Sequence, residues 1–137
     1  MIDTILCDTD FLIALLIEND TNHTKARYIL DTHISSDFIY SNLTEYELMT
    51  VLSRKLPQDI AIQAYNLFTA TFTSRVVFEL ELEKEAVALY RKSTNKNQSF
   101  FDIACLVTAK KHNYKIASFD RFYPNNMLVN NQSTTNQ

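Results

Sequence analysis

The chain of 137 residues contains no glycine. Glycine reaches positive φ without steric cost and lets the backbone approach a ligand closely. The P-loop, the GxGxxG dinucleotide turn and the GxSxG nucleophile elbow all depend on it, so the sequence excludes these three catalytic scaffolds. Asparagine tolerates the left-handed conformation best among the other residues. We therefore expect Asn19, Asn95 and Asn113, which all follow helical patterns, to end helices in that conformation.

Short apolar runs alternate with helical patterns along the chain. Runs typical of buried strands occupy residues 2–7, 38–40, 76–80 and 115–118, and helical spacing of apolar residues occupies 11–17, 22–32, 44–56, 58–72, 83–93 and 102–113. This alternation predicts an α/β fold, a three-layer α/β/α sandwich with a mostly parallel central sheet and helices on both faces. The length suits a single domain, expected over residues 1–124, with a short edge strand at 127–129 and a polar, disordered tail in 125–137.

The helix expected at 58–72 carries Ile62, Tyr65 and either Phe68 or Leu67 at helical spacing. Core or dimer packing explains these side chains without a ligand. The two cysteines, Cys7 in an expected strand and Cys105 in an expected helix, form no CxxC pair, and we interpret them as buried free thiols.

The composition also bears on location and partners. No apolar run approaches the roughly 18 residues of a membrane span, and the first residues, MIDTILCD, lack the basic and long apolar regions of a signal peptide. We expect a cytoplasmic protein with no membrane association. The net charge is −3, but basic clusters such as Arg54-Lys55, Arg91-Lys92 and Lys110-Lys111 leave a nucleic-acid partner open.

Four acidic residues follow or begin the expected elements. Asp8 comes directly after an expected strand, and Asp120 lies just past another. Asp102 lies in the first turn of an apolar helix, and Glu47 lies beside the buried stripe of another helix. Because ligands of parallel sheets bind at the carboxyl ends of the strands, we expect these side chains to converge. Asp8 is equally well explained as a helix N-cap. Glu47 is favoured over Glu45, which lies on a neighbouring face, although exposed partners of the helix dipole would explain both.

Four converging carboxylates repel one another unless a cation neutralises them. Mg²⁺ or Mn²⁺ is the expected cation because it prefers hard oxygen ligands and keeps bound waters. Such a site activates water and stabilises charge on a phosphodiester, without a histidine or serine nucleophile. The acids therefore predict metal-dependent hydrolysis.

Each acid also belongs to a short motif. Asp8 follows a hydrophobic strand in ILCDTDFLIAL, and Glu47 fits S-x-x-x-x-x-E-L-x-x-V-L through Ser41, Leu48, Val51 and Leu52. Asp102 fits an S-F-x-D helix start through Ser99 and Phe100, and Asp120 fits T-x-D-x-x-F through Ser118 and Tyr123. In this order the motifs resemble those of the PIN-domain ribonucleases, and in particular the VapC-type toxins of bacterial and archaeal toxin–antitoxin pairs. The similarity extends to about residue 124.

This resemblance implies Asp8, Glu47, Asp102 and Asp120 as catalytic metal ligands. It also implies endonucleolytic cleavage of RNA, a homodimer, and inhibition by a small VapB-like antitoxin. The chain departs from the family at Asp10, where a neutral residue is usual, so Asp10 is expected to support the site or to add a ligand. Ser118 is expected to orient Asp120 or a bound water by hydrogen bonding.

Two other interpretations stay open. The Asp8-Thr9-Asp10 sequence resembles the DxD opening of haloacid-dehalogenase-like phosphatases, in which the first aspartate is a nucleophile and the second a general acid. That family's pattern asks for a small β-branched residue where Leu12 stands, and for a glycine-rich acidic loop that this chain lacks. A PIN-like module that binds RNA or a partner without cutting is the other alternative, against which the complete set of four acids weighs.

Overall fold

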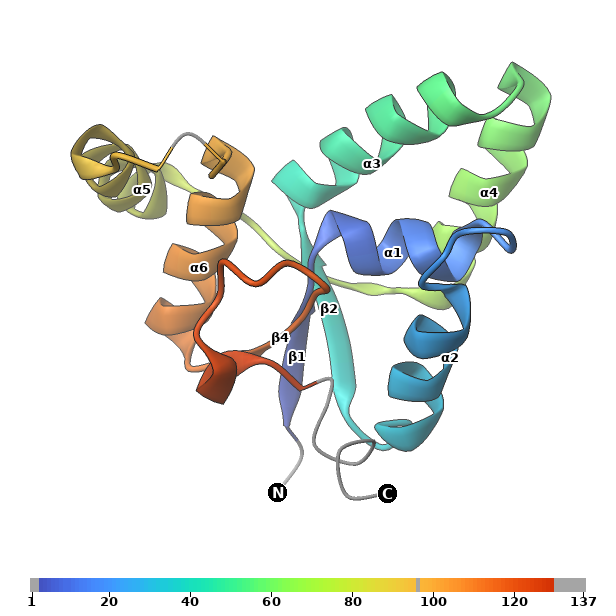
Figure 1. The fold of residues 1–137 in the computed structure, drawn as a ribbon, viewed down its shortest axis with the longest axis horizontal. Helices are drawn as coiled ribbons and strands as arrows, with labels where there is room; N and C mark the ends of the chain where they lie inside the picture. The colour runs from blue at the N-terminus through green and yellow to red at the C-terminus, as the bar shows by residue number, and fades with distance from the viewer. Residues whose placement is uncertain (1–2, 96, 130–137) are drawn as a thin grey trace.

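The computed structural model describes residues 3–95 and 97–129. Its centre is a four-stranded parallel sheet of order β3-β2-β1-β4, made of Thr4–Cys7 (β1), Asp37–Ser41 (β2), Ser74–Val76 (β3) and Lys115–Ala117 (β4). The helices are Thr9–Leu16 (α1), His23–Thr32 (α2), Asn42–Lys55 (α3), Gln58–Thr71 (α4), Leu80–Lys92 (α5) and Phe100–His112 (α6), and a short 3₁₀ helix spans Asn125–Met127. Figure 1 shows α1 to α4 on one side of the sheet and α6, with α5 outside it, on the other.

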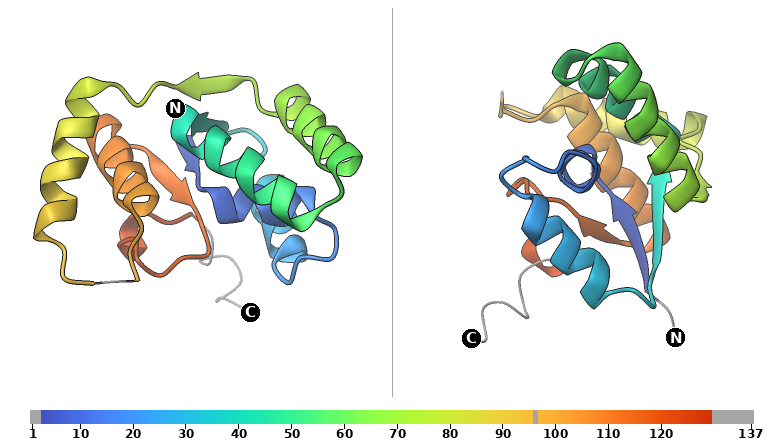
Figure 2. Two further views of the ribbon diagram at one scale, coloured as in Figure 1. Left: turned by 90° about the horizontal axis from the view of Figure 1, so that it is seen from above. Right: turned by 90° about the vertical axis from the view of Figure 1, so that its right-hand side faces the viewer.

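Strand β1 is buried on both faces, which explains its unbroken apolar run. Ile5 and Cys7 point into a core formed with α1, α2, α3 and α4, whereas Leu6 points into a second core formed with α6. Helix α5 is separated from the sheet by α6, against which its Leu82 and Ala86 pack. Helices therefore cover both faces of the sheet, and the predicted α/β/α sandwich is confirmed; the view in Figure 2 from above shows the same layers.

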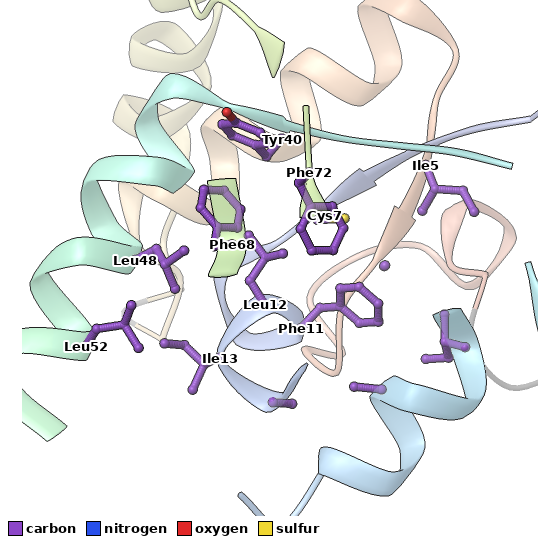
Figure 3. Packing of buried hydrophobic residues seen from close by; sticks show 14 of the residues in the cluster. Ile5, Cys7, Phe11, Leu12, Ile13, Tyr40, Leu48, Leu52, Phe68 and Phe72 are labelled. Carbon is purple, nitrogen blue, oxygen red and sulfur yellow. The ribbon is translucent and has the colours of Figure 1, made fainter. Parts of the chain in front are cut away.

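The larger core also settles which residue of α4 faces inward. Phe68 is fully buried and contacts Tyr40 of β2 edge to face, with ring centroids 4.7 Å apart. Figure 3 shows Leu12 of α1 and Leu48 of α3 converging on the same ring. Leu67 is 57% exposed and Ile62 is 50% exposed, so the inward position belongs to Phe68.

Among the described residues, Asn113 alone has a positive φ, 58°, and it ends α6 in the left-handed conformation as expected. The same prediction is wrong for Asn19 and Asn95. The residues that cap the ends of α1 and α5 are Ile17 and Ser93, and both are extended. The chain has therefore left each helix before it reaches the asparagine.

Two strand predictions differ from the structure. The buried strand predicted at 76–80 is wrong, because β3 is an edge strand that ends at Val76, Val77 is 54% exposed, and Leu80 already begins α5. The edge strand predicted at 127–129 is reduced to a parallel bridge between Leu128 and Ile116. The predicted tail at 130–137 lies outside the described residues. No helix in the described part of the chain combines the length and apolarity of a membrane span.

The two neighbours on α4 provide a direct test of this packing. We expect Phe68→Ala to lower the free energy of unfolding by about 3–5 kcal/mol, because it opens a cavity between α1, α3, α4 and β2. Leu67→Ala, which removes an exposed side chain, should change it by no more than about 0.5 kcal/mol. Chemical denaturation of the two variants measures both values, and equal losses would contradict the assignment of the buried face.

Candidate functional site

The first acids of the site lie where β1 and β4 end side by side. Asp8 directly follows β1, and its backbone N–H donates to the carbonyl of Ala117, the last residue of β4, at 3.0 Å. Asp120 comes three residues after Ala117. Parallel pairing of β1 and β4 thus brings together two segments that are more than 100 residues apart in the sequence.

Glu47 and Asp102 reach the same end of the sheet on helices. Ser41, the last residue of β2, caps α3 by accepting a hydrogen bond from the backbone N–H of Thr44, and Glu47 follows one turn later. Ser99 and Asp102 form a capping box at the start of α6, with reciprocal hydrogen bonds of 3.1 Å. In Figure 1 both helices begin at the upper end of the sheet. Local capping signals therefore position these two acids.

Six carboxylates line one open pocket of about 360 Å³. The structure brings together all four acids that the sequence singled out, Asp8, Glu47, Asp102 and Asp120. It adds Asp10 from α1 and Asp20 from the segment between α1 and α2. Lys55, at the end of α3, lines the same pocket. The four acids singled out from the sequence therefore converge, as expected for residues near the carboxyl ends of parallel strands.

Glu45 lies elsewhere, although it is only two residues from Glu47. It is buried, it accepts a hydrogen bond from the hydroxyl of Tyr65 on α4 at 2.5 Å, and its carboxylate lies 3.7 Å from the guanidinium of Arg75 on β3. An exposed position on the helix is therefore wrong for Glu45. The contacts give it a structural role, joining α3 to α4 and β3.

Asp8 is buried and accepts three hydrogen bonds. The backbone N–H of Thr9 donates to Oδ1 at 2.8 Å, which makes Asp8 the N-cap of α1. The hydroxyls of Ser118 and Tyr123 both donate to Oδ2 at 3.0 Å. Asp8 is therefore both a helix cap and a site residue, since Oδ1 caps α1 and Oδ2 is held beside the pocket.

Asp10 shares the hydroxyl of Ser118 with Asp8. Ser118 Oγ lies 3.2 and 3.3 Å from the two oxygens of Asp10, and the backbone N–H of Phe119 donates to Oδ2 of Asp10 at 3.0 Å. The backbone N–H of Asp120 donates to the same Ser118 Oγ at 3.0 Å. Ser118 therefore contacts three of the acidic residues, two through their side chains and Asp120 through its backbone.

Burial and like charge act together on these acids. Burial raises the pKa of Asp8 from 3.8 to about 7, and the neighbouring charge of Asp10 adds to the increase. Burial also raises the pKa of Asp10 to about 6, although the hydrogen bonds from Phe119 and Ser118 oppose it. The pKa values of Glu47 and Asp102 are raised as well, mainly by burial. The pocket thus favours proton uptake or a cation.

Sequence reasoning missed Asp20, whose Oδ1 accepts a hydrogen bond from the backbone N–H of Asn22 at 2.8 Å, and two hydrogen-bond donors. Thr9 donates its hydroxyl proton to Glu47 Oε1 and so ties α3 to the start of α1. In the sequence Tyr123 is only a motif position, yet burial raises the pKa of its phenol far above the ordinary value, so the hydroxyl stays protonated and donates to Asp8. The available signal was a tyrosine at a position where the resembling pattern has phenylalanine.

The donor set fits a hard divalent cation, because it consists of carboxylates with raised pKa values around a polar pocket. Among the described residues, no three or more His, Cys, Asp or Glu side chains are positioned so that together they could hold a metal ion. Protein donors hold the carboxylates instead: Thr9 donates to Glu47, the Ser99 cap to Asp102, and Ser118 is shared by Asp8 and Asp10. Mg²⁺ typically takes only one or two carboxylates directly and keeps several waters, which is consistent with an open arrangement.

The sequence model of the PIN domain family matches residues 5–124 of the chain. No curated protein matches.

Several solved structures share the fold. VapC20 from Mycobacterium tuberculosis, described as a sarcin-ricin loop cleaving toxin, is 24% identical with a TM-score of 0.76, over 86% of this chain and 91% of that one. A toxin–antitoxin complex from Klebsiella pneumoniae is 19% identical with a TM-score of 0.64, over 86% and 88%. VapBC2 from Rickettsia felis, solved with a DNA fragment from its promoter, is 11% identical with a TM-score of 0.65, over 85% and 88%.

The raised pKa values predict how stability depends on pH. Without added metal, we expect the free energy of unfolding to fall as pH rises from about 4 to about 7, because the folded protein holds protons on Asp8 and Asp10 that the unfolded chain has lost. Added Mg²⁺ should stabilise the protein more at pH 8 than at pH 5. Denaturation across this range checks both trends, and Asp8→Asn should flatten the metal-free profile. A metal-free profile that rises with pH would contradict the prediction.

The hydroxyl of Tyr123 can be tested alone. Tyr123→Phe keeps the buried ring but removes a donor to a buried carboxylate, so we expect it to lower the free energy of unfolding by about 1.5–3 kcal/mol. Tyr28→Phe, on an exposed tyrosine of α2, is the matched control and should change it by no more than about 0.5 kcal/mol. Equal effects in denaturation experiments would show that the hydrogen bond contributes nothing.

Proposed function

Because the chain belongs to the PIN domain family, we propose that it is a divalent-metal-dependent endoribonuclease and the toxin of a type II toxin–antitoxin system. The observation that carries the proposal is the pocket at the carboxyl end of the sheet, where Asp8, Asp10, Glu47, Asp102 and Asp120 converge. A protein does not gather so many carboxylates for stability, because desolvation and mutual repulsion both oppose it. Chemistry on a phosphodiester explains the arrangement.

Asp8, Glu47, Asp102 and Asp120 are the proposed ligands. Mg²⁺ or Mn²⁺, when bound, supplies an activated water and positive charge beside the scissile phosphate. The protein's own part is to hold the acids. The N-cap bond and the hydroxyls of Ser118 and Tyr123 fix the Asp8 carboxylate, and Thr9 fixes Glu47.

Two residues have proposed supporting roles. Asp10 is held by the backbone of Phe119 and so ties α1 to the segment that carries Asp120. Lys55, which lines the pocket from the end of α3, is the residue that we propose contacts an RNA phosphate next to the one that is cut.

The partners follow from the resemblance and from the neighbours in fold. The structure from Klebsiella pneumoniae is a toxin–antitoxin complex, and VapC20 is described as a toxin that cleaves the sarcin-ricin loop. We accordingly propose RNA as the substrate, a VapB-like antitoxin as the inhibitor, a homodimer as the active form and the cytoplasm as the site of action.

The two alternatives fare differently. The family match and the structural neighbours do not support the haloacid-dehalogenase-like phosphatase. Asp10, which would be its general acid, instead accepts hydrogen bonds from Ser118 and from the backbone of Phe119. A non-catalytic PIN module that binds RNA or a protein is the second candidate. The complete set of acids favours the nuclease over it.

Cleavage of total RNA with Mg²⁺ or Mn²⁺ tests the proposal. We expect Asp8→Asn, Glu47→Gln, Asp102→Asn and Asp120→Asn each to reduce the rate roughly 100-fold or more, as for groups that act at the reacting atoms. Glu45→Gln, on the same helix as Glu47 but outside the pocket, is the matched control and should cut like the wild type. Chelation of the metal should abolish cleavage. Equal cleavage by the wild type and Asp8→Asn, with both folded, would overturn the proposal.

A further inference from the structure

A second pocket lies next to the acidic one, on the other side of the start of α6. It has a volume of about 340 Å³ and lies between the end of α5, the first turns of α6 and the segment after β4. Its floor is formed by Ile103 and Leu106, which are buried, and by Phe122, which is partly buried. Leu89, which is 41% exposed, and Lys92 and Gln98 line it from α5 and the loop before α6. We call it the α5–α6 pocket. Its volume is at the small end of the range for ligand sites in proteins.

Two residues connect this pocket directly to the acids. Ile103 follows Asp102 in α6, so adjacent residues line the two pockets. Phe122 lines the α5–α6 pocket while its backbone N–H donates to Oδ1 of Asp120 at 3.0 Å. The two pockets are therefore separated only by the start of α6 and the segment that carries Asp120 and Phe122. An RNA strand bound at the acids needs to cross only these segments to reach the second pocket.

The electrostatic character of the two pockets is opposite. None of the described residues that line the α5–α6 pocket carries a carboxylate, and Lys92, in the basic last turn of α5, supplies a positive charge. The side-chain oxygen of Gln98 accepts a hydrogen bond from the hydroxyl of Ser93 at 2.7 Å, a bond that does not use its amide N–H groups. The pocket thus combines apolar surface, an aromatic ring, an amide and a cation.

This combination suits an unstacked nucleotide. Proteins recognise single-stranded RNA by stacking its bases on aromatic side chains, by hydrogen bonds to base edges and by cations at the phosphates. We propose that the α5–α6 pocket binds one base of the RNA strand next to the cleaved phosphate, with the base against Phe122 and Leu89 and the adjoining phosphate at Lys92. The inference rests on the proposed ribonuclease function, and it makes this pocket a determinant of where the RNA is cut.

Binding of nucleotides to the α5–α6 pocket is measured first, in an experiment that does not depend on RNA cleavage. Protein with labelled Ile and Leu methyl groups is titrated with each of the four nucleoside 5′-monophosphates and followed by NMR. We expect saturable shifts at Leu89, Ile103 and Leu106, and none at Ile62 and Leu67, which are exposed on α4. Shifts at the pocket methyls support the proposal even if the protein cuts no RNA. Absence of shifts there for all four nucleotides would overturn it.

Variants then test the link to cleavage. Leu89→Asp introduces a carboxylate at a partly exposed pocket position, and Lys92→Ala removes the cation; Lys84→Ala, on the same helix outside the pocket, is the matched control. With Ca²⁺ present, we expect Leu89→Asp and Lys92→Ala to bind a short random-sequence RNA roughly tenfold more weakly than the control, the scale of one lost base contact. With Mg²⁺, they should still cut total RNA but at a changed set of sites.

These readouts separate the two hypotheses. If the wild type cuts no RNA while nucleotides shift the pocket methyls, the nuclease proposal fails and the binding site stands. If the wild type cuts RNA and both variants match Lys84→Ala in affinity and in cut sites, the inference about this pocket is overturned and the nuclease proposal stands.

Discussion

Repulsion among buried carboxylates at the carboxyl end of the sheet is the constraint on which the rest of the structure depends. Asp8 and Asp10 each have a raised pKa because of burial, and each is held by hydrogen bonds from segments that follow β4. The residues from Ser118 to Tyr123 supply most of these donors. The parallel pairing of β1 with β4 is what places that segment over the acids. Fold and site therefore depend on the same contact.

Much of this arrangement could be predicted from the sequence, because it depends on local signals. Ser41 and Ser99 are capping residues that mark where α3 and α6 begin, and these starts position Glu47 and Asp102. The apolar run of β1 ends at Asp8, and parallel strands end at one edge, so convergence of the acids follows from the order of elements. The same local chemistry identified Asn113 as the left-handed end of α6.

What the sequence did not reveal depends on tertiary contacts. Glu45 and Glu47 differ by two positions on one helix, and only the placement of Tyr65 and Arg75 makes Glu45 a buried structural acid. The edge position of β3 left Val77 exposed and allowed Leu80 to begin a helix, against a run of residues that favour strands. The hydrogen bond from Tyr123 to Asp8 joins residues 115 positions apart, so no local pattern contains it.

The central claim is that the acidic pocket holds the divalent cation that cleavage requires. Anomalous diffraction from crystals grown with Mn²⁺ tests it most directly, because it locates the ion without any assay of activity. The account predicts an anomalous peak in the pocket, within coordination distance of carboxylates from the set Asp8, Glu47, Asp102 and Asp120, and loss of that peak in Asp8→Asn. Saturating Mn²⁺ with no peak in this pocket, or with a peak only at another place on the protein, would contradict it.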